Sequence, residues 1–182
     1  DLYTKAGDYP SLANLMEGWG DALQDSRAAG EAYVAAADAL LMAGRATSEA
    51  RLLFERALSR DAANVQALDR LTRLLEDARD FERLKQVLKY VAYQLEQAEA
   101  EPNATTADSS GSRQRLASVH YRLGQVYETH FAEPRKAATL YRLAIEENPR
   151  LITAIVAARR LYEESGNHKA VSKLYEYEIE AT

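Results

Sequence analysis

Cysteine is absent from the 182-residue chain, and proline and glycine are scarce, at 4 and 8 residues. Without cysteine, the chain can form neither a disulfide framework nor a thiolate metal site. The scarcity of helix breakers, together with abundant Ala, Leu, Glu and Arg, favours helices over strands. We therefore expect an all-α protein.

Long apolar runs are also missing. The most apolar stretch, residues 33–42, contains Asp38 and is too short to cross a bilayer, so no membrane insertion is expected. The formal net charge is −5, whereas neutralising phosphates needs a surplus of Lys and Arg. Nucleic acid is therefore not an expected partner. Separately, we expect the chain to be located in the cytoplasm.

A repeated pattern runs through the chain. Tyr33 and Leu68 hold one place in it and are 35 residues apart, as are His120 and Ile155. The clearest copy consists of Tyr121, Leu123, Gly124, Tyr127, Ala137, Tyr141, Ala144 and Pro149. This order resembles the tetratricopeptide repeat, in which an aromatic residue, Leu-Gly, Tyr, Ala, a second aromatic residue, Ala and Pro recur within about 34 residues. The copy departs from the family at His120, where an aromatic residue is usual, and by one extra residue before Ala137.

The resemblance implies antiparallel helix hairpins stacked as a right-handed tetratricopeptide-like α-solenoid, with about nine helices in this chain. Small residues such as Gly124 let the two helices of a hairpin approach closely, and Tyr127 and Tyr141 fill the space between hairpins. Because Asp1 is followed by what resembles the end of a helix, we expect a fragment of a longer array. Within a single repeat domain we distinguish a half-repeat (1–26), a repeat (27–62), a repeat with a long second helix (63–100), a polar loop (101–112), a repeat (113–149) and a divergent repeat (150–182).

Three turns of the pattern align without gaps and are centred on Gly7, Arg79 and Gly166. Each is followed by a residue that caps helix N-termini well, namely Asp8, Asp80 and Asn167. We predict that a helix starts after each of them. The helix after Asp80 is predicted to run from Phe81 to Ala100, and the segment EPNATTADSSGS that follows is predicted to be a solvated loop.

No catalytic, cofactor or metal site is predicted, and we expect a protein that is not an enzyme. The histidines His120, His130 and His168 are far apart, and none lies four residues from a second histidine. His120 takes a packing position of the repeat and is expected in the core. No serine has the glycine-rich or elbow context of a nucleophile.

The resemblance places partner binding on the first helix of each hairpin. Arg73 and Arg160 hold the same repeat position there, and Arg and Tyr are frequent anchors of protein interfaces. The candidate partner-binding residues are Arg70, Arg73, Tyr121, Arg122, Gln125, Arg159 and Arg160. We expect a groove that takes an acidic or extended segment of a partner protein or peptide. The alternative is that these arginines pair with acidic residues of neighbouring helices.

The predicted function is that of a scaffold or adaptor, because stacked hairpins offer a long surface for a partner protein. Two alternatives stay open. Exposed repeat ends could associate, which would make the chain a self-associating structural segment of a larger protein. Single-stranded RNA binding, in the manner of pentatricopeptide repeats, is opposed by the acidic charge.

Overall fold

The computed structural model describes residues 3, 7–44, 47–100 and 106–181. Over these residues the chain forms helices joined by short turns, with no strand, so the all-α prediction is confirmed. None of the described helices is both long and apolar enough to cross a membrane.

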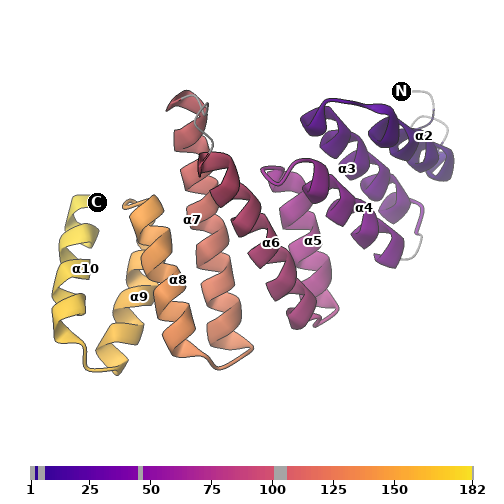
Figure 1. Ribbon diagram of the computed structural model, residues 1–182. Coiled ribbons are helices and arrows are strands. Elements are labelled where there is room, and N and C mark those ends of the chain that lie inside the picture. The colour runs from indigo at the N-terminus through magenta and orange to yellow at the C-terminus, as the bar shows by residue number, and fades with distance from the viewer. Residues whose placement is uncertain (1–2, 4–6, 45–46, 101–105, 182) are drawn as a thin grey trace. The chain divides into compact units, whose positions relative to one another are not determined.

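The chain divides into two compact units, Asp1–Asp80 and Phe81–Thr182. The first contains α2 (Tyr9–Ala22), α3 (Ser26–Met42), α4 (Thr47–Arg60) and α5 (Val65–Asp77). The second contains α6 (Phe81–Ala100), α7 (Thr106–Thr129), α8 (Pro134–Glu147), α9 (Ile152–Glu164) and α10 (His168–Ala181). Within each unit, successive helices turn back on one another as hairpins (Figure 1). The boundary falls between α5 and α6, inside the predicted repeat 63–100, and the assignment of repeats within a single domain stays a prediction.

The first unit is built around α3, which packs against both α2 and α4. The alanines of α3 make this two-sided approach possible, and Ala36 and Ala37 are completely buried. On the α2 side the ring of Tyr33 lies against Gly20, where a Cβ would come within 2.6 Å of the ring. On α4, Phe54 is completely buried. Small side chains therefore allow the helices to approach closely, and aromatic rings fill the space that remains between them.

The second unit repeats this arrangement in the hairpin of α7 and α8. Tyr141 of α8 is 1% exposed and lies over Gly124 of α7, where a Cβ would come within 2.5 Å of the ring. The close helix approach expected at Gly124 is confirmed, and the ring that fills it is Tyr141 of the same hairpin, a residue that was expected between hairpins. Leu84 and Leu88 of α6 and Ile155 of α9 are completely buried in the same unit.

The three aligned turns share one backbone geometry. Their central residues have positive φ angles, 68° at Gly7, 54° at Arg79 and 71° at Gly166. In each turn the next N–H donates to the carbonyl five residues earlier, as in a Schellman C-cap: Asp8 to Tyr3 (3.0 Å), Asp80 to Leu75 (2.9 Å) and Asn167 to Tyr162 (2.9 Å). The three turns that align in the sequence therefore also share one backbone conformation.

The predicted helix starts are also found. The Asp8 side chain accepts from the Ser11 N–H at 3.2 Å, and that of Asn167 accepts from the Ala170 N–H at 3.2 Å. Asp80 directly precedes α6, and its carboxylate also pairs with Arg51 at 2.9 Å.

Between α7 and α8 the turn is one residue longer. The Glu133 N–H donates to the carbonyl of Tyr127, six residues earlier, at 3.0 Å, and Ala132 takes the positive φ of 52°. The extra residue noted in the sequence is therefore absorbed by a wider turn.

Arg79→Gly is expected to raise the free energy of unfolding of the first unit by up to about 1 kcal/mol. Arg79 is the one aligned turn residue with a Cβ, which the left-handed conformation disfavours. Urea unfolding followed by the fluorescence of Trp19, which lies in the same unit, measures the change.

The reciprocal variant Gly166→Ala is expected to destabilise the second unit by a comparable amount. A loss of stability in Arg79→Gly would mean that contacts of the arginine side chain outweigh the backbone strain.

The polar loop is predicted too long. Residues 101–105 lie outside the described residues, but α7 begins at Thr106, so residues 106–112 are helical rather than looped. This stretch contains no proline, which would break a helix. Extending a helix that is already anchored costs far less than starting one. The helix predicted for residues 81–100 is confirmed as α6.

Candidate partner-binding surfaces

Side chains of α7, α8 and α9 form a connected polar network in the second unit. Gln125 donates from Nε2 to the hydroxyl of Tyr121 at 3.2 Å, and the ring of Tyr121 lies 5.6 Å from that of Tyr141. The Tyr141 hydroxyl donates to Glu128 Oε2 at 2.8 Å, and Arg160 pairs with the other oxygen of Glu128. We call the surface that carries Tyr121, Gln125 and Arg160 the α7–α9 face.

Helical spacing accounts for the network on α7. Tyr121, Gln125 and Glu128 follow one another at intervals of four and three residues and so share one side of the helix. Burial, and then the hydrogen bond to Glu128, raise the pKa of Tyr141 far above its ordinary value. The hydroxyl therefore remains a donor, which fixes the Glu128 carboxylate in front of Arg160.

The predicted arginines of the second unit are engaged within the chain. Arg160 pairs with Glu128 and also with Glu164 at 3.5 Å. Arg159 turns toward α10, where it donates to the hydroxyl of Tyr175 at 2.9 Å and pairs with Glu178 at 3.4 Å. For both arginines the alternative of pairing with acidic neighbours is what the structure shows. Arg122 is half-buried on α7 and makes an interaction of its own.

The other two candidates lie on α5 of the first unit. Arg70 pairs with Asp38 of α3 at 3.2 Å, and burial raises the pKa of Asp38 while Arg70 lowers it. Arg73 is exposed. Of the seven predicted residues, the structure therefore connects Tyr121, Gln125 and Arg160, and Arg159 faces α10 instead.

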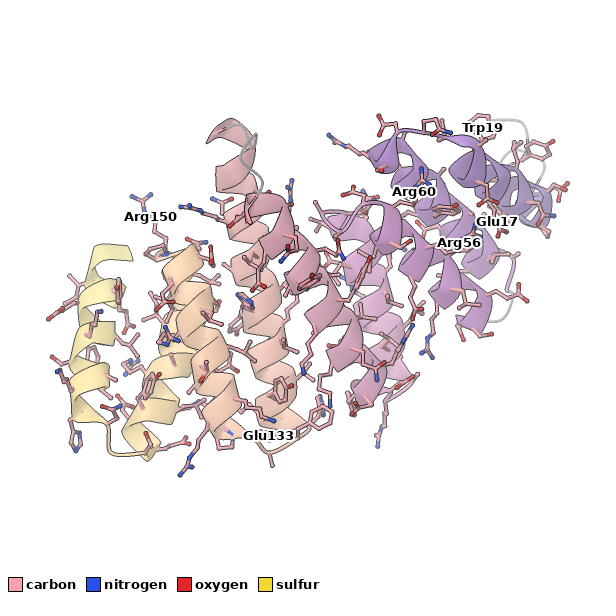
Figure 2. All side chains as sticks on the ribbon, in the orientation of Figure 1. Glu17, Trp19, Arg56, Arg60, Glu133 and Arg150 are labelled. Carbon is pink, nitrogen blue, oxygen red and sulfur yellow. The ribbon has the colours of Figure 1, made fainter. Side chains whose placement is uncertain are left out.

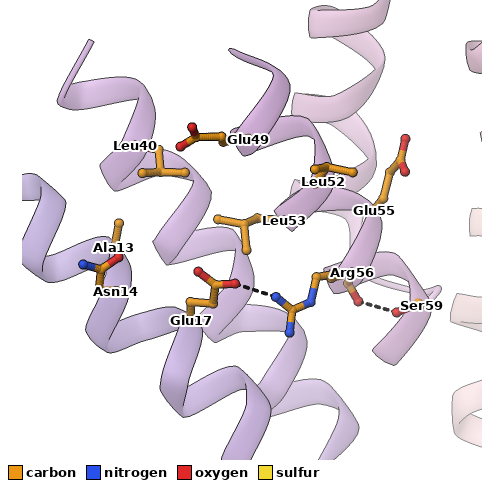
Figure 3. Close-up of a pocket in the computed structure, with 10 residues that line it drawn as sticks. All are labelled: Ala13, Asn14, Glu17, Leu40, Glu49, Leu52, Leu53, Glu55, Arg56 and Ser59. Atoms are coloured by element: carbon orange, nitrogen blue, oxygen red, sulfur yellow. Dashed lines mark hydrogen bonds and ion pairs between the residues drawn. The ribbon is translucent and has the colours of Figure 1, made fainter. Parts of the chain in front are cut away.

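A groove that sequence reasoning missed lies between α2 and α4, with α3 beneath it. Its volume is about 590 Å³, and Figure 3 shows its lining. The lining residues are Ala13, Asn14, Glu17, Leu40, Glu49, Leu52, Leu53, Glu55, Arg56 and Ser59. In the predicted repeat frame α2 and α4 are second helices, so the α2–α4 groove opens on helices that the prediction had not considered.

Arg56 lines this groove, and hydrogen bonds and ion pairs hold its side chain in place. Its guanidinium donates to Glu17 at 2.6 Å and to the Tyr33 hydroxyl at 3.1 Å, and it also pairs with Asp21. Its carbon Cζ lies 4.5 Å from the centre of the Tyr33 ring. Figure 2 shows Glu17 and Arg56 side by side. The positive charge of Arg56 is thus matched within the fold.

A smaller groove of about 360 Å³ lies between α8 and α9. It is lined by Pro134, Arg135, Ala138, Thr139, Leu161, Tyr162, Glu164 and Ser165. Charges of both signs border it, so it favours no one class of ligand.

A buried imidazole lies between α6 and α7. His120 is 4% exposed, which confirms the expected core position, and its Nε2 lies 3.5 Å from Glu96 Oε1. Its Nδ1 has no hydrogen-bond partner among the described residues. Burial lowers the pKa of His120, against the opposing effect of Glu96. Across residues 7–44, 47–100 and 106–181, no three His, Asp or Glu side chains gather as a metal site would need.

The stability of the second unit is expected to fall as the pH drops below about 6.5. Because the pKa of His120 is lowered in the fold, the unfolded chain binds the proton more tightly. The stabilisation is complete above the unfolded-state pKa and is lost as the pH falls toward the folded-state value, by at most about 1.4 kcal/mol per pH unit. In His120→Phe this part of the slope should vanish, as measured by amide hydrogen exchange of α7 between neutral and mildly acidic pH.

Glu147 acts in the opposite direction, because burial and the neighbouring Glu99 raise its pKa. Glu147 is present in the wild-type protein and in His120→Phe, so the difference between the two slopes of stability against pH isolates the contribution of His120. The control is His168→Gln, which replaces an exposed imidazole at the start of α10. Equal slopes in the wild-type protein and His120→Phe would show that His120 binds a proton equally well in the folded and the unfolded chain, contrary to a lowered pKa.

No protein-family model matches the chain, and no curated protein matches it. Several solved structures do match the chain. The crystal structure of MamA aligns with 100% of this chain and 92% of its own, with a TM-score of 0.56 and 16% identity. BtubC (BKLC) from P. vanneervenii aligns with 100% of this chain and 76% of its own, with a TM-score of 0.58 and 17% identity.

The fold is a tetratricopeptide-like helical repeat. A double mutant of MamA RS-1 agrees, covering 98% of this chain and 88% of its own at a TM-score of 0.54 and 16% identity. Identities this low establish the fold alone. Membership of the tetratricopeptide family itself stays a prediction.

Proposed function

We propose that this helical-repeat chain is a protein-interaction module, a scaffold or adaptor that binds a partner protein or peptide on its first helices. The observation that carries the proposal is the network behind the α7–α9 face. Glu128 holds Tyr141 and Arg160 in place, and Tyr141 in turn supports the ring of Tyr121. Side chains fixed before binding lose less conformational entropy when a partner arrives.

Tyr and Arg are also the residue types that most often anchor protein interfaces. Tyr121 and Gln125 offer a ring, a hydroxyl and an amide on one side of α7, which suits an extended backbone as well as side chains. Arg70 and Arg73, on α5 of the first unit, are also among the residues that we propose to bind the partner. An acidic partner would compete with the carboxylates of the chain that pair with Arg70, Arg159 and Arg160.

Site-specific photo-crosslinking tests this proposal. A photoreactive amino acid at Gln125, which is exposed on α7, is expected to crosslink one partner protein in lysate of the cells that make the chain. The same label at Arg150, in the exposed turn after α8, should not crosslink it. Arg122→Glu with Arg160→Glu should abolish the crosslink from Gln125.

The matched control for that double variant is Arg83→Glu with Arg135→Glu, which changes the charge equally on α6 and α8 of the same unit. If both double variants retain the partner, the α7–α9 face is not its binding surface. Crosslinking to RNA instead of protein would contradict the function itself.

Self-association is a second candidate, favoured by the exposed apolar residues of α10. Tyr175 is 45% and Ile179 76% exposed. If these residues meet a second copy, the sedimentation coefficient of the chain rises with concentration, and Ile179→Glu abolishes the rise. A coefficient that does not change with concentration would contradict this candidate.

A further inference from the structure

We propose that the α2–α4 groove binds a basic amphipathic segment of a partner protein, in which an apolar side chain is flanked by Lys or Arg. This surface is separate from the α7–α9 face and lies within the first unit alone. The proposal rests on an apolar floor, an exposed leucine at the edge and carboxylates around the rim.

The floor of the groove is apolar and well packed. Ala13, Leu40 and Leu53, from α2, α3 and α4, are 2%, 8% and 5% exposed. Leu52 stands at the edge of this floor and is 62% exposed (Figure 3). Covering such a leucine with an apolar side chain of a partner removes apolar surface from water and so favours binding.

The rim of the groove is acidic. Glu49 lines it on α4, and on the α2 side Glu17 and Asp21 both pair with the one guanidinium of Arg56. Because Arg56 already pairs with Glu17 and Asp21, it offers an incoming ligand no unmatched positive charge. The carboxylates therefore set the sign of the field over the apolar floor, and this field attracts cations.

Lys and Arg suit this combination better than a free cation does. Their methylene stems can lie along the apolar floor while their charged ends reach carboxylates at the rim. A volume of about 590 Å³ holds a few side chains rather than a whole helix. The expected ligand is thus one face of a helix or an extended stretch that inserts one apolar residue between basic ones.

The same carboxylates disfavour other occupants. Acidic peptides, phosphorylated segments and anionic membrane surfaces would bring negative charge against Glu17, Asp21 and Glu49. A second copy of this chain is a poorer match than a basic partner, because its net charge is −5.

The test uses a fluorescent peptide of about 16 residues, long enough to form a helix, with leucines on one side and lysines flanking them. Anisotropy is recorded on the full chain at low and moderate salt, beside a peptide with glutamates in place of the lysines. The groove variant is Glu49→Lys with Leu52→Ser. Its matched control is Asp77→Lys with Val65→Ser, the same charge change and the loss of another exposed apolar residue on α5.

We expect the lysine peptide to bind, to weaken with salt, and to bind the groove variant about tenfold more weakly, equivalent to about 1.4 kcal/mol. The control pair should bind as the wild-type protein does, and the glutamate peptide should not bind. A photoreactive leucine analogue in the lysine peptide should crosslink to α2 or α4. All four substitutions lie on exposed positions, and Glu49→Gln alone gives the milder variant if the pair impairs folding.

Equal weakening in the groove variant and its control would overturn the proposal, because binding would then follow net charge alone. Crosslinks confined to other helices would overturn it as well. Dimers of the peptide-free chain that the groove variant loses would assign the groove to a second copy instead. The α7–α9 face is tested separately, by a label in the other unit, so failure of the groove proposal leaves the proposed function standing.

Discussion

Tyr141→Ala is expected to lower the free energy of unfolding of the second unit by about 3–5 kcal/mol. The ring is 1% exposed and fills the space above Gly124, so its removal leaves a cavity that the helix backbones close only in part. The substitution also removes the donor to Glu128 and the ring beside Tyr121.

Amide hydrogen exchange of α7, α8 and α9 measures this loss, because Trp19, the chain's single tryptophan, lies in the other unit and reports that unit instead. Tyr141→Phe is the matched control. It keeps the ring and removes only the hydroxyl, at an expected cost of about 1 kcal/mol. If the two variants lost equal stability, the hydrogen bond rather than the ring would dominate at this position.

Gly20→Ala is expected to destabilise the first unit by about 1–3 kcal/mol, although Ala is the better helix former by about 1 kcal/mol. The added Cβ would come within 2.6 Å of the Tyr33 ring. That ring cannot shift freely, because its hydroxyl donates to Asp21 at 2.6 Å and Arg56 lies over its face. Either the ring or α2 must move.

Gly18→Ala is the matched control on the same helix. Among the described residues, no atom lies within 4 Å of a Cβ built on Gly18, so the change should stabilise the unit by up to about 1 kcal/mol. Trp19 stands between the two glycines and reports both variants by its fluorescence during urea unfolding. Stabilisation by both substitutions would mean that the close approach of α2 to Tyr33 is not required.

The sequence predicted what depends on short stretches of chain. The turns centred on Gly7, Arg79 and Gly166 align in the sequence, and the structure gives all three residues a positive φ angle, because a turn conformation is set by a few consecutive residues. The close helix approach at Gly124 was predicted for a related reason, because it follows from the repeat pattern, but the contact of Gly124 with Tyr141 of the same hairpin was not predicted. The start of α7 was mispredicted, because residues 106–112 are weakly helical alone and their state depends on the helix that follows.

The candidate surfaces were predictable only in part. Helical spacing placed Tyr121 and Gln125 together, which the structure confirms. Spacing could not show whether Arg160 is free or paired, because its partner Glu128 lies on another helix and a pair forms only when two side chains come within about 4 Å.

By itself, the sequence determined the helices, the turns between them and the close helix approach at Gly124, because helix propensity, capping and repeat pattern act over short separations. Only the tertiary structure decided which charges are neutralised and where a groove opens. Leu52 and Glu49 resemble any exposed helix residues until α2 is placed beside α4 with Leu40 beneath them. The physical reason is that pairing and burial depend on distances between helices, and those distances are set by packing across the whole unit.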